Sequence, residues 1–154
     1  MNPYNGGGTD RERRGRERVA ILDTTLVIDL MREAKRRKAG RAVVKLHELV
    51  QRGEPLRVSL FTVAELYVGI AKGTQPKRER KAVETALAPF DIVPFERNTA
   101  EIFGGVVGQL ELQGTPISDM DALIAATTLE LSELLVTRNP SHFTRVPGLR
   151  VESY

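Results

Sequence analysis

The sequence predicts an α/β domain with a mainly parallel central sheet that is covered by helices on both faces. Short apolar runs of strand length alternate along the chain with longer segments in which apolar residues recur at helical spacing. This alternation is typical of successive strand–helix–strand units. A length of 154 residues, 41% of them hydrophobic, fits a single domain with a sizeable core.

The expected elements follow one another from residue 19 to the C-terminus. Strands are predicted at residues 19–22, 57–61, 92–95 and 134–137, with a last short apolar piece at 149–152. Helices are predicted from Thr24 or Thr25 onward and at residues 34–53, 62–73, 76–88, 98–114 and 118–133.

The first eighteen residues differ in composition from the rest of the chain. They hold five arginines and three acids, are rich in glycine and contain almost no apolar side chains. Such a segment buries too little apolar surface to offset the entropy lost on ordering. We therefore expect a mobile charged tail at residues 1–18 and the folded domain at residues 19–154.

The composition limits the chemistry of any site. There is no cysteine and the only histidines are His47 and His142, so thiolate zinc sites and cysteine nucleophiles are excluded and a metal would be held mainly by oxygen. No segment approaches the roughly 18 apolar residues of a membrane span, and the N-terminus is polar where a signal peptide would be apolar. A cytoplasmic protein is predicted. The net charge of +3 is compatible with a polyanionic partner but does not identify one.

Polar side chains follow the predicted strands. Asp23 comes directly after the first strand, Glu65 lies in the first turn of the helix after the second, and Asn139 follows the fourth. Asp119 and Asp121 open the last long helix. Because ligands of open α/β sheets bind outside the carboxyl ends of the strands, we expect these side chains to gather at that edge.

Helix capping is an alternative explanation for several of these acids. Three pairs have the spacing of a capping box: Thr62 with Glu65, Asn98 with Glu101, and Ser118 with Asp121. Asp23 has no predicted capping role, and no lysine or arginine lies beside it in the sequence. A carboxylate at the end of a buried strand needs a partner, and a divalent cation such as Mg²⁺ or Mn²⁺ would supply one.

Four segments carry a resemblance to a known family. They are LDTTLVIDLM, VSLFTVAELYVGI, TPISDMDALIAATTLE and LLVTRNPSHFTRVPGLRV. In this order and spacing they resemble the PIN-domain ribonucleases, specifically the VapC-type toxins of bacterial toxin–antitoxin pairs. The likeness runs from about Val19 to the C-terminus. It implies a PIN-like fold and a metal-dependent RNA endonuclease that hydrolyses phosphodiester bonds.

The resemblance also implies the site residues. The three acids of the family fall on Asp23, Glu65 and Asp121, which would hold Mg²⁺ or Mn²⁺. Asn139 occupies the fourth acidic place and brings no charge, which puts a second tightly held metal in doubt. Asp119 is not a family position. It could supply the charge that Asn139 lacks, or it could simply stand at a helix N-terminus, where acids are favoured.

Three further side chains lie close to these positions in the sequence. Thr24 follows the first acid, where its hydroxyl can steady a carboxylate or cap the next helix. Thr137 lies near the site or simply fills a strand with a β-branched residue. His142 could assist proton transfer, although the family mechanism does not require a histidine.

The resemblance implies partners as well. The substrate would be an RNA, with tRNA and rRNA as candidates, and the chain would form a homodimer held inactive by a cognate VapB-type antitoxin. The apolar segment at residues 60–70 could offer the antitoxin a surface, and core packing explains that segment equally well. Phosphate contacts dominate nucleic-acid affinity, and the candidate basic residues are Arg32, Lys35, Arg36, Arg37, Lys38, Lys72, Lys77, Arg78, Arg138 and Arg145.

Two alternatives stay open from the sequence. The first is a catalytically weak or inactive PIN-like module that binds RNA or protein, because Asn139 replaces an acid. The second is a receiver-like phosphotransfer domain, which also gathers acids at strand ends. That class needs paired acids after the first strand and a lysine after a late strand, whereas this chain has Asp23 alone and Arg138.

Overall fold

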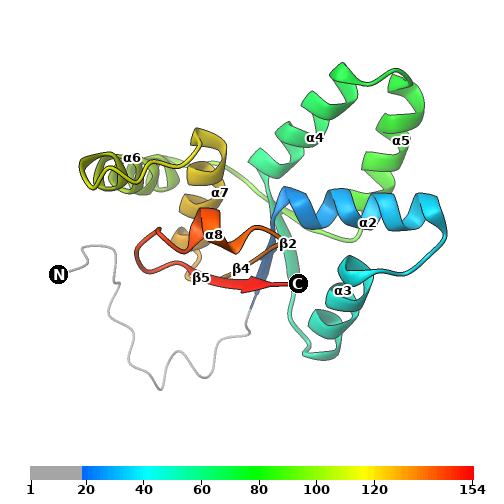
Figure 1. Ribbon diagram of the computed structural model, residues 1–154, viewed down its shortest axis with the longest axis horizontal. Helices are drawn as coiled ribbons and strands as arrows, with labels where there is room; N and C mark the ends of the chain where they lie inside the picture. The colour runs from blue at the N-terminus through cyan, green and yellow to red at the C-terminus, as the bar shows by residue number, and fades with distance from the viewer. Residues whose placement is uncertain (1–18) are drawn as a thin grey trace.

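The computed structural model describes residues 19–154 (Figure 1). The tail predicted at residues 1–18 lies outside the described residues, so the predicted division of the chain at residue 19 stays a prediction. Within residues 19–154, no helix is long and apolar enough to cross a membrane.

Five parallel strands form one sheet in the order β3-β2-β1-β4-β5. The strands are β1 (Ala20–Leu22), β2 (Leu56–Ser59), β3 (Asp91–Val93), β4 (Leu134–Thr137) and β5 (Arg150–Ser153). The predicted α/β class with a mainly parallel sheet is confirmed. The short apolar piece near the C-terminus is a fifth strand, which pairs with β4.

Seven helices connect and cover the strands. They are α2 (Thr24–Arg36), α3 (Arg41–Gln51), α4 (Leu60–Lys72), α5 (Pro76–Leu87), α6 (Arg97–Leu112), α7 (Asp119–Glu130) and the short α8 (Pro140–Phe143). In Figure 1, α2 to α5 lie on one side of the strands and α6, α7 and α8 on the other. Helices on both faces leave the strands buried, as a parallel sheet requires.

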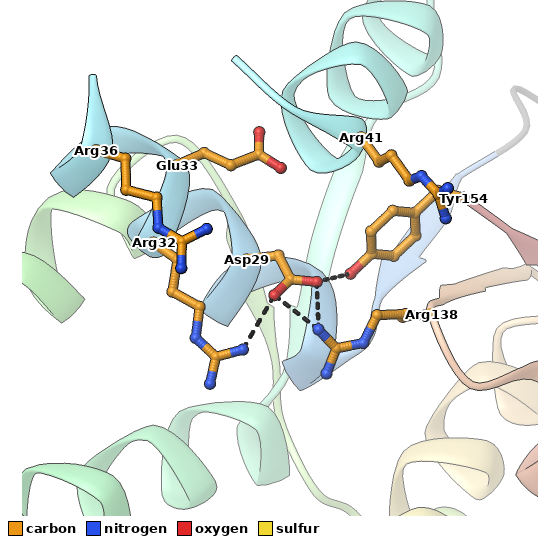
Figure 2. Close-up of a pocket in the computed structure, with 7 residues that line it drawn as sticks. All are labelled: Asp29, Arg32, Glu33, Arg36, Arg41, Arg138 and Tyr154. Carbon is orange, nitrogen blue, oxygen red and sulfur yellow. Dashed lines mark hydrogen bonds and ion pairs between the residues drawn. The ribbon is translucent and has the colours of Figure 1, made fainter. Parts of the chain in front are cut away.

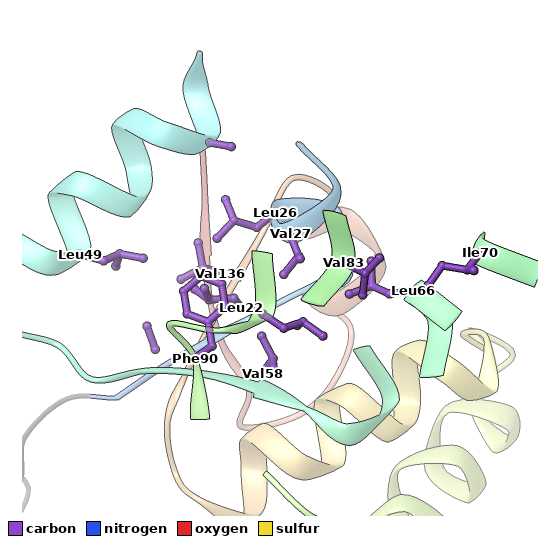
Figure 3. Packing of buried hydrophobic residues seen from close by; sticks show 13 residues of the cluster. Leu22, Leu26, Val27, Leu49, Val58, Leu66, Ile70, Val83, Phe90 and Val136 are labelled. Atoms are coloured by element: carbon purple, nitrogen blue, oxygen red, sulfur yellow. The ribbon is translucent and has the colours of Figure 1, made fainter. Parts of the chain in front are cut away.

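The two faces of the sheet form two hydrophobic clusters. In β1, Ala20 and Leu22 belong to the cluster under α2 to α5, and Ile21 belongs to the cluster under α6, α7 and α8. Alternate side chains of a strand point to opposite faces, and all three here are fully buried. Figure 3 shows Leu22 with Val58 of β2 in the first of these clusters. Burying one such aliphatic side chain contributes about 1.5–3 kcal/mol.

The strand order reverses at β1. The chain runs outward from β1 to β2 and β3, then returns to place β4 on the other side of β1. Helices that follow β1 and β4 therefore leave toward opposite faces of the sheet. Ligands of open α/β sheets bind outside the carboxyl ends of the strands at such a switch point. Asp23 and Arg138 are the first residues beyond the two strands.

The predicted helix starts are partly wrong. Helix α4 begins at Leu60 rather than Thr62, and the Ser59 hydroxyl caps it by accepting from the Thr62 amide at 3.0 Å. Helix α6 is capped by Glu96 rather than Asn98. Helix α7 begins after Ser118 as predicted, with the Ser118 hydroxyl accepting from the amide of the third helical residue at 3.1 Å.

The helix predicted at residues 34–53 is interrupted. Arg37 takes a left-handed backbone conformation with φ of 52° and ends α2, and α3 starts after Gly40. The backbone N–H groups at the start of α3 find their hydrogen-bond acceptor on α2. Glu33 accepts from the Gly40 amide at 2.8 Å and from two amides of α3 at 3.0 Å. Glu33 therefore joins the two helices through the unpaired amides of a helix N-terminus.

Candidate active site

Asp23 lies buried at the carboxyl end of β1, with 4% of its surface exposed. Its Oδ2 accepts hydrogen bonds from the hydroxyls of Thr137 at 2.7 Å and Thr25 at 2.8 Å, and its Oδ1 accepts from the Thr24 amide at 2.8 Å. Its own amide donates to the Val136 carbonyl at 2.9 Å. Bonds from both α2 and β4 therefore fix this carboxylate at the carboxyl end of β1.

The two threonine hydroxyls that hold Asp23 also organise the loop after β4. Thr137 Oγ1 accepts from the Asn139 amide at 3.0 Å, and Thr25 Oγ1 accepts from the Arg138 amide at 3.2 Å. Each hydroxyl donates to the carboxylate and accepts from the loop, which uses both of its hydrogen-bonding functions.

Asp23 also caps α2, which corrects the expectation that it has no capping role. It is the N-cap residue and accepts from the Thr24 amide. The capping bond does not cancel the free-energy cost of removing this carboxylate from water, because its pKa stays raised. Burial raises the pKa of Asp23, the bonds from Thr137, Thr25 and the Thr24 amide lower it in part, and the charge of Asp121 raises it further.

Glu65 lies in the second turn of α4, whose start is fixed by the Ser59 cap. The Thr24 hydroxyl donates to Glu65 Oε2, so the first helix after β1 contacts the acid on the helix after β2. Burial raises the pKa of Glu65, the Thr24 hydrogen bond lowers it in part, and the charges of Asp23 and Asp121 raise it. Glu65 therefore lies within electrostatic range of both other predicted acids.

Asp121 lies in the first turn of α7 and is partly exposed. Its Oδ2 is 3.3 Å from Nδ1 of His142, which α8 supplies. Asp119, two residues earlier, is exposed, and its charge stands at the helix N-terminus where acids are favoured.

Asn139 is half-buried and precedes α8 as its N-cap residue, without a capping bond from its side chain. The backbone amide of Asn139 donates a hydrogen bond to the Thr137 hydroxyl, which in turn donates to Asp23. The predicted site residues therefore lie at the end of β1, on α4, on α7 and in the loop after β4.

The donor chemistry of this region fits a hard divalent cation. Within residues 19–154, neither Asp23 nor Glu65 forms an ion pair with a lysine or arginine, and the pKa of each is raised by burial and by the charges of other carboxylates. Carboxylate oxygens in this electrostatic state are the ligands that Mg²⁺ and Mn²⁺ prefer. In the conformation described for residues 19–154, however, no three acidic or histidine side chains come close enough together to hold one ion.

Sequence reasoning misses one residue of this arrangement and leaves two others undecided. The sequence indicates Thr25 only as a possible helix start, although its hydroxyl bonds Asp23. Thr24 and Thr137 each have a structural alternative in the sequence, and both bond a predicted acid. Consecutive threonines directly after an acid at a strand end are the signal that points to two of these contacts.

The fold and the site define an α/β domain with a buried carboxylate, Asp23, at the switch point of a parallel sheet. A family model described as "PIN domain" matches residues 20–149. The chain therefore belongs to the PIN domain family.

Similar proteins place it among the VapC ribonucleases of that family. Ribonuclease VapC2 of Haemophilus influenzae is 32% identical over 134 residues, which cover 87% of this chain and 96% of the relative. The tRNA(fMet)-specific endonuclease VapC of Salmonella typhimurium is 29% identical over 97 residues, 63% of this chain and 74% of the relative. The structure of VapBC-1 from nontypeable Haemophilus influenzae aligns with a TM-score of 0.75 at 26% identity, covering 88% of this chain and 97% of that one. The predicted family is confirmed, and the receiver-like alternative is wrong.

The pKa shifts predict how pH affects stability without metal. Because the pKa values of Asp23 and Glu65 are raised on folding, the folded protein binds more protons than the unfolded chain, and stability falls as the pH rises through the raised values. Asp23→Asn removes one of these groups. In EDTA, its melting temperature relative to the wild type should rise from about pH 4 to about pH 7.

The matched control is Asp119→Asn, which neutralises an exposed acid on the same edge. Its melting temperature relative to the wild type should change much less over that range. A constant difference between Asp23→Asn and the wild type at every pH would contradict the electrostatic account of Asp23.

Proposed function

We propose that the chain is a metal-dependent RNA endonuclease, the toxin of a toxin–antitoxin pair, with Asp23, Glu65 and Asp121 as metal ligands. The observation that carries this proposal is the buried Asp23 carboxylate at the switch point. Its charge interacts electrostatically with those of Glu65 and Asp121, and within residues 19–154 it has no basic partner. Membership of the VapC ribonucleases supports the RNA hydrolase activity.

Mg²⁺ or Mn²⁺ bound by these acids would supply a bound water of lowered pKa and would neutralise charge on the phosphate. The protein's own contribution is positioning. Thr25 and Thr137 hold Asp23 in one orientation, and Thr24 holds Glu65 toward the same edge. Such fixed groups avoid the cost of reorganisation during the reaction.

Asn139 and His142 complete the proposed site. Asn139 offers an uncharged amide that can donate to or accept from the substrate or a water. His142 contacts Asp121 and fixes the direction in which that carboxylate points. Asn139 is assigned to the catalytic residues, and His142 acts through Asp121 as a positioning residue.

The proposed substrate is an RNA, and tRNA is favoured over rRNA as the first candidate. The support is the relative from Salmonella typhimurium, which is named as specific for tRNA(fMet). Initiator tRNA is therefore the first RNA to test.

The proposed partners are a second copy of the chain and a VapB-type antitoxin. The solved VapBC-1 structure supports the antitoxin. Helix α4 exposes apolar surface at Leu60, Tyr67 and Val68, which is suited to covering by another chain. A cytoplasmic location is proposed with these partners, since the RNA substrate and the antitoxin would be met there. The inactive-module alternative is not favoured, because the similar proteins are named ribonucleases and endonucleases.

Cleavage of initiator tRNA in Mg²⁺ or Mn²⁺ tests the activity and the site together. Asp23→Asn and Asp121→Asn should each lower the cleavage rate about 100-fold or more, because bound metal supplies several kcal/mol and each 1.36 kcal/mol is tenfold. Asp119→Asn is the matched control on α7 and should cleave at the wild-type rate. Equal cleavage by all four proteins would remove the proposed site.

Metal binding should be visible as stabilisation, independent of any RNA. A ligand that binds only the folded state stabilises it by about 2.7 kcal/mol at 100 times its dissociation constant. The melting temperature of the wild type should therefore be higher in Mn²⁺ than in EDTA, and that of Asp23→Asn should respond much less. Coincident wild-type melts in the two buffers would count against the metal site.

The homodimer is tested by sedimentation of the purified chain. The expected species has twice the mass of one chain, and Val68→Glu should shift it toward the monomer, because a carboxylate would have to be buried at the interface. Arg78→Glu on the exposed part of α5 is the control. A wild type that sediments only as a monomer at micromolar concentration would contradict the dimer.

A further inference from the structure

A cavity of about 340 Å³ lies beside the proposed active site and is lined mainly by arginines. Figure 2 shows its walls, which come from α2, the start of α3, the loop after β4 and the C-terminal residue. The lining residues are Asp29, Arg32, Glu33, Arg36, Arg41, Arg138 and Tyr154. Four positive and two negative side chains give this arginine cavity an excess of positive charge.

The two acids of the arginine cavity are already engaged. Asp29 accepts from one guanidinium nitrogen of Arg138 at 2.7 and 2.8 Å, from Arg32 at 3.3 Å and from the Tyr154 hydroxyl at 3.0 Å. Glu33 accepts from three amides at the start of α3. Within residues 19–154, neither carboxylate forms an ion pair with Arg36 or Arg41.

Arg36 and Arg41 are the arginines that remain. Within residues 19–154 neither forms an ion pair, and both side chains are exposed at the cavity. In the view of Figure 2 they lie on either side of Glu33. A guanidinium presents its N–H groups in a fixed fork that matches a phosphate, so two unpaired guanidinium groups around one cavity favour an anionic phosphate ligand.

The arginine cavity is joined to the active site through Arg138. The side chain of Arg138 pairs with Asp29 in the cavity wall, while its amide donates to Thr25, whose hydroxyl holds Asp23. Helix α2 also runs from the active site at Thr24 to the cavity at Arg36. A single polyanion can therefore extend from one site to the other along α2.

We propose that the arginine cavity binds a backbone phosphate of the RNA that flanks the phosphate to be cleaved, with Arg36 and Arg41 as its direct ligands. This proposal rests on the proposed ribonuclease function and adds the path of the substrate. Asp29 holds Arg32 and Arg138 in the wall and leaves Arg36 and Arg41 as the groups that gain a partner on binding. An acidic segment of a protein partner is the competing occupant.

RNA binding without metal tests this proposal separately from cleavage. The full chain is titrated in EDTA against a fluorescent single-stranded RNA of mixed sequence, and anisotropy is followed at several salt concentrations. The double variant Arg36→Gln/Arg41→Gln should bind about tenfold more weakly or worse. The slope of log affinity against log salt should fall by about 0.7 for each phosphate that the variant no longer neutralises.

The matched control is Lys81→Gln/Arg97→Gln, which removes the same charge from two exposed positions outside the cavity. It should keep the wild-type slope. Each single arginine variant is measured as well, so that a folding defect of the double variant leaves a test in place, and melting curves identify such a defect.

Three results would overturn the proposal. The first is wild-type affinity and slope in the arginine variants. The second is an equal loss in the Lys81/Arg97 control, which would indicate only the general positive charge of the protein. The third is unchanged RNA binding with weakened binding of a VapB-type antitoxin, which would assign the cavity to an acidic protein segment. Absence of RNA cleavage by the wild type, together with the expected binding result, would instead refute the proposed activity and leave the cavity assignment standing.

Discussion

The burial of one carboxylate at the point where the strand order reverses is the constraint on which the rest of this site depends. Asp23 ends the central strand and is almost completely removed from solvent. Such a group needs hydrogen bonds or a counter-charge. Thr24, Thr25 and Thr137 provide the hydrogen bonds. Thr24 and Thr25 open the helix that follows β1, and Thr137 is the last residue of the neighbouring strand β4.

The same hydrogen bonds define the directions in which neighbouring groups point. The threonines that hold the acids bind Glu65 on one side and the loop after β4 on the other. The charges of these carboxylates repel one another, which is unfavourable in the chain alone. A cation bound between them would replace this repulsion with attraction. The proposed binding of a divalent ion would thus depend on the threonine framework as much as on the acids.

The strands were predictable because each is a short apolar run with polar boundaries, and the acids were predictable because each follows a strand or opens a helix. The helix starts at Ser59 and Glu96 were missed because polar residues two or three positions apart have equivalent capping chemistry. The partners of Asp23 and Arg138 could not be predicted locally. Thr137 is 114 positions from Asp23, and Arg138 is 109 from Asp29, so these contacts exist only through the sheet order. The arginine cavity likewise brings residues 29–41 together with Arg138 and Tyr154, which lie far along the chain.

The position of β1 between β2 and β4 has a consequence for how the protein is made. Strand β4 is synthesised long after β1, and a chain leaves the ribosome N-terminus first at about 5–20 residues per second. The hydrogen bond from Thr137 to Asp23 can therefore form only late in translation, when Thr137, Arg138 and Asn139 have been synthesised. A nascent chain therefore lacks part of the proposed nuclease centre, and only molecules at or near full length would cleave RNA in the cell that produces them.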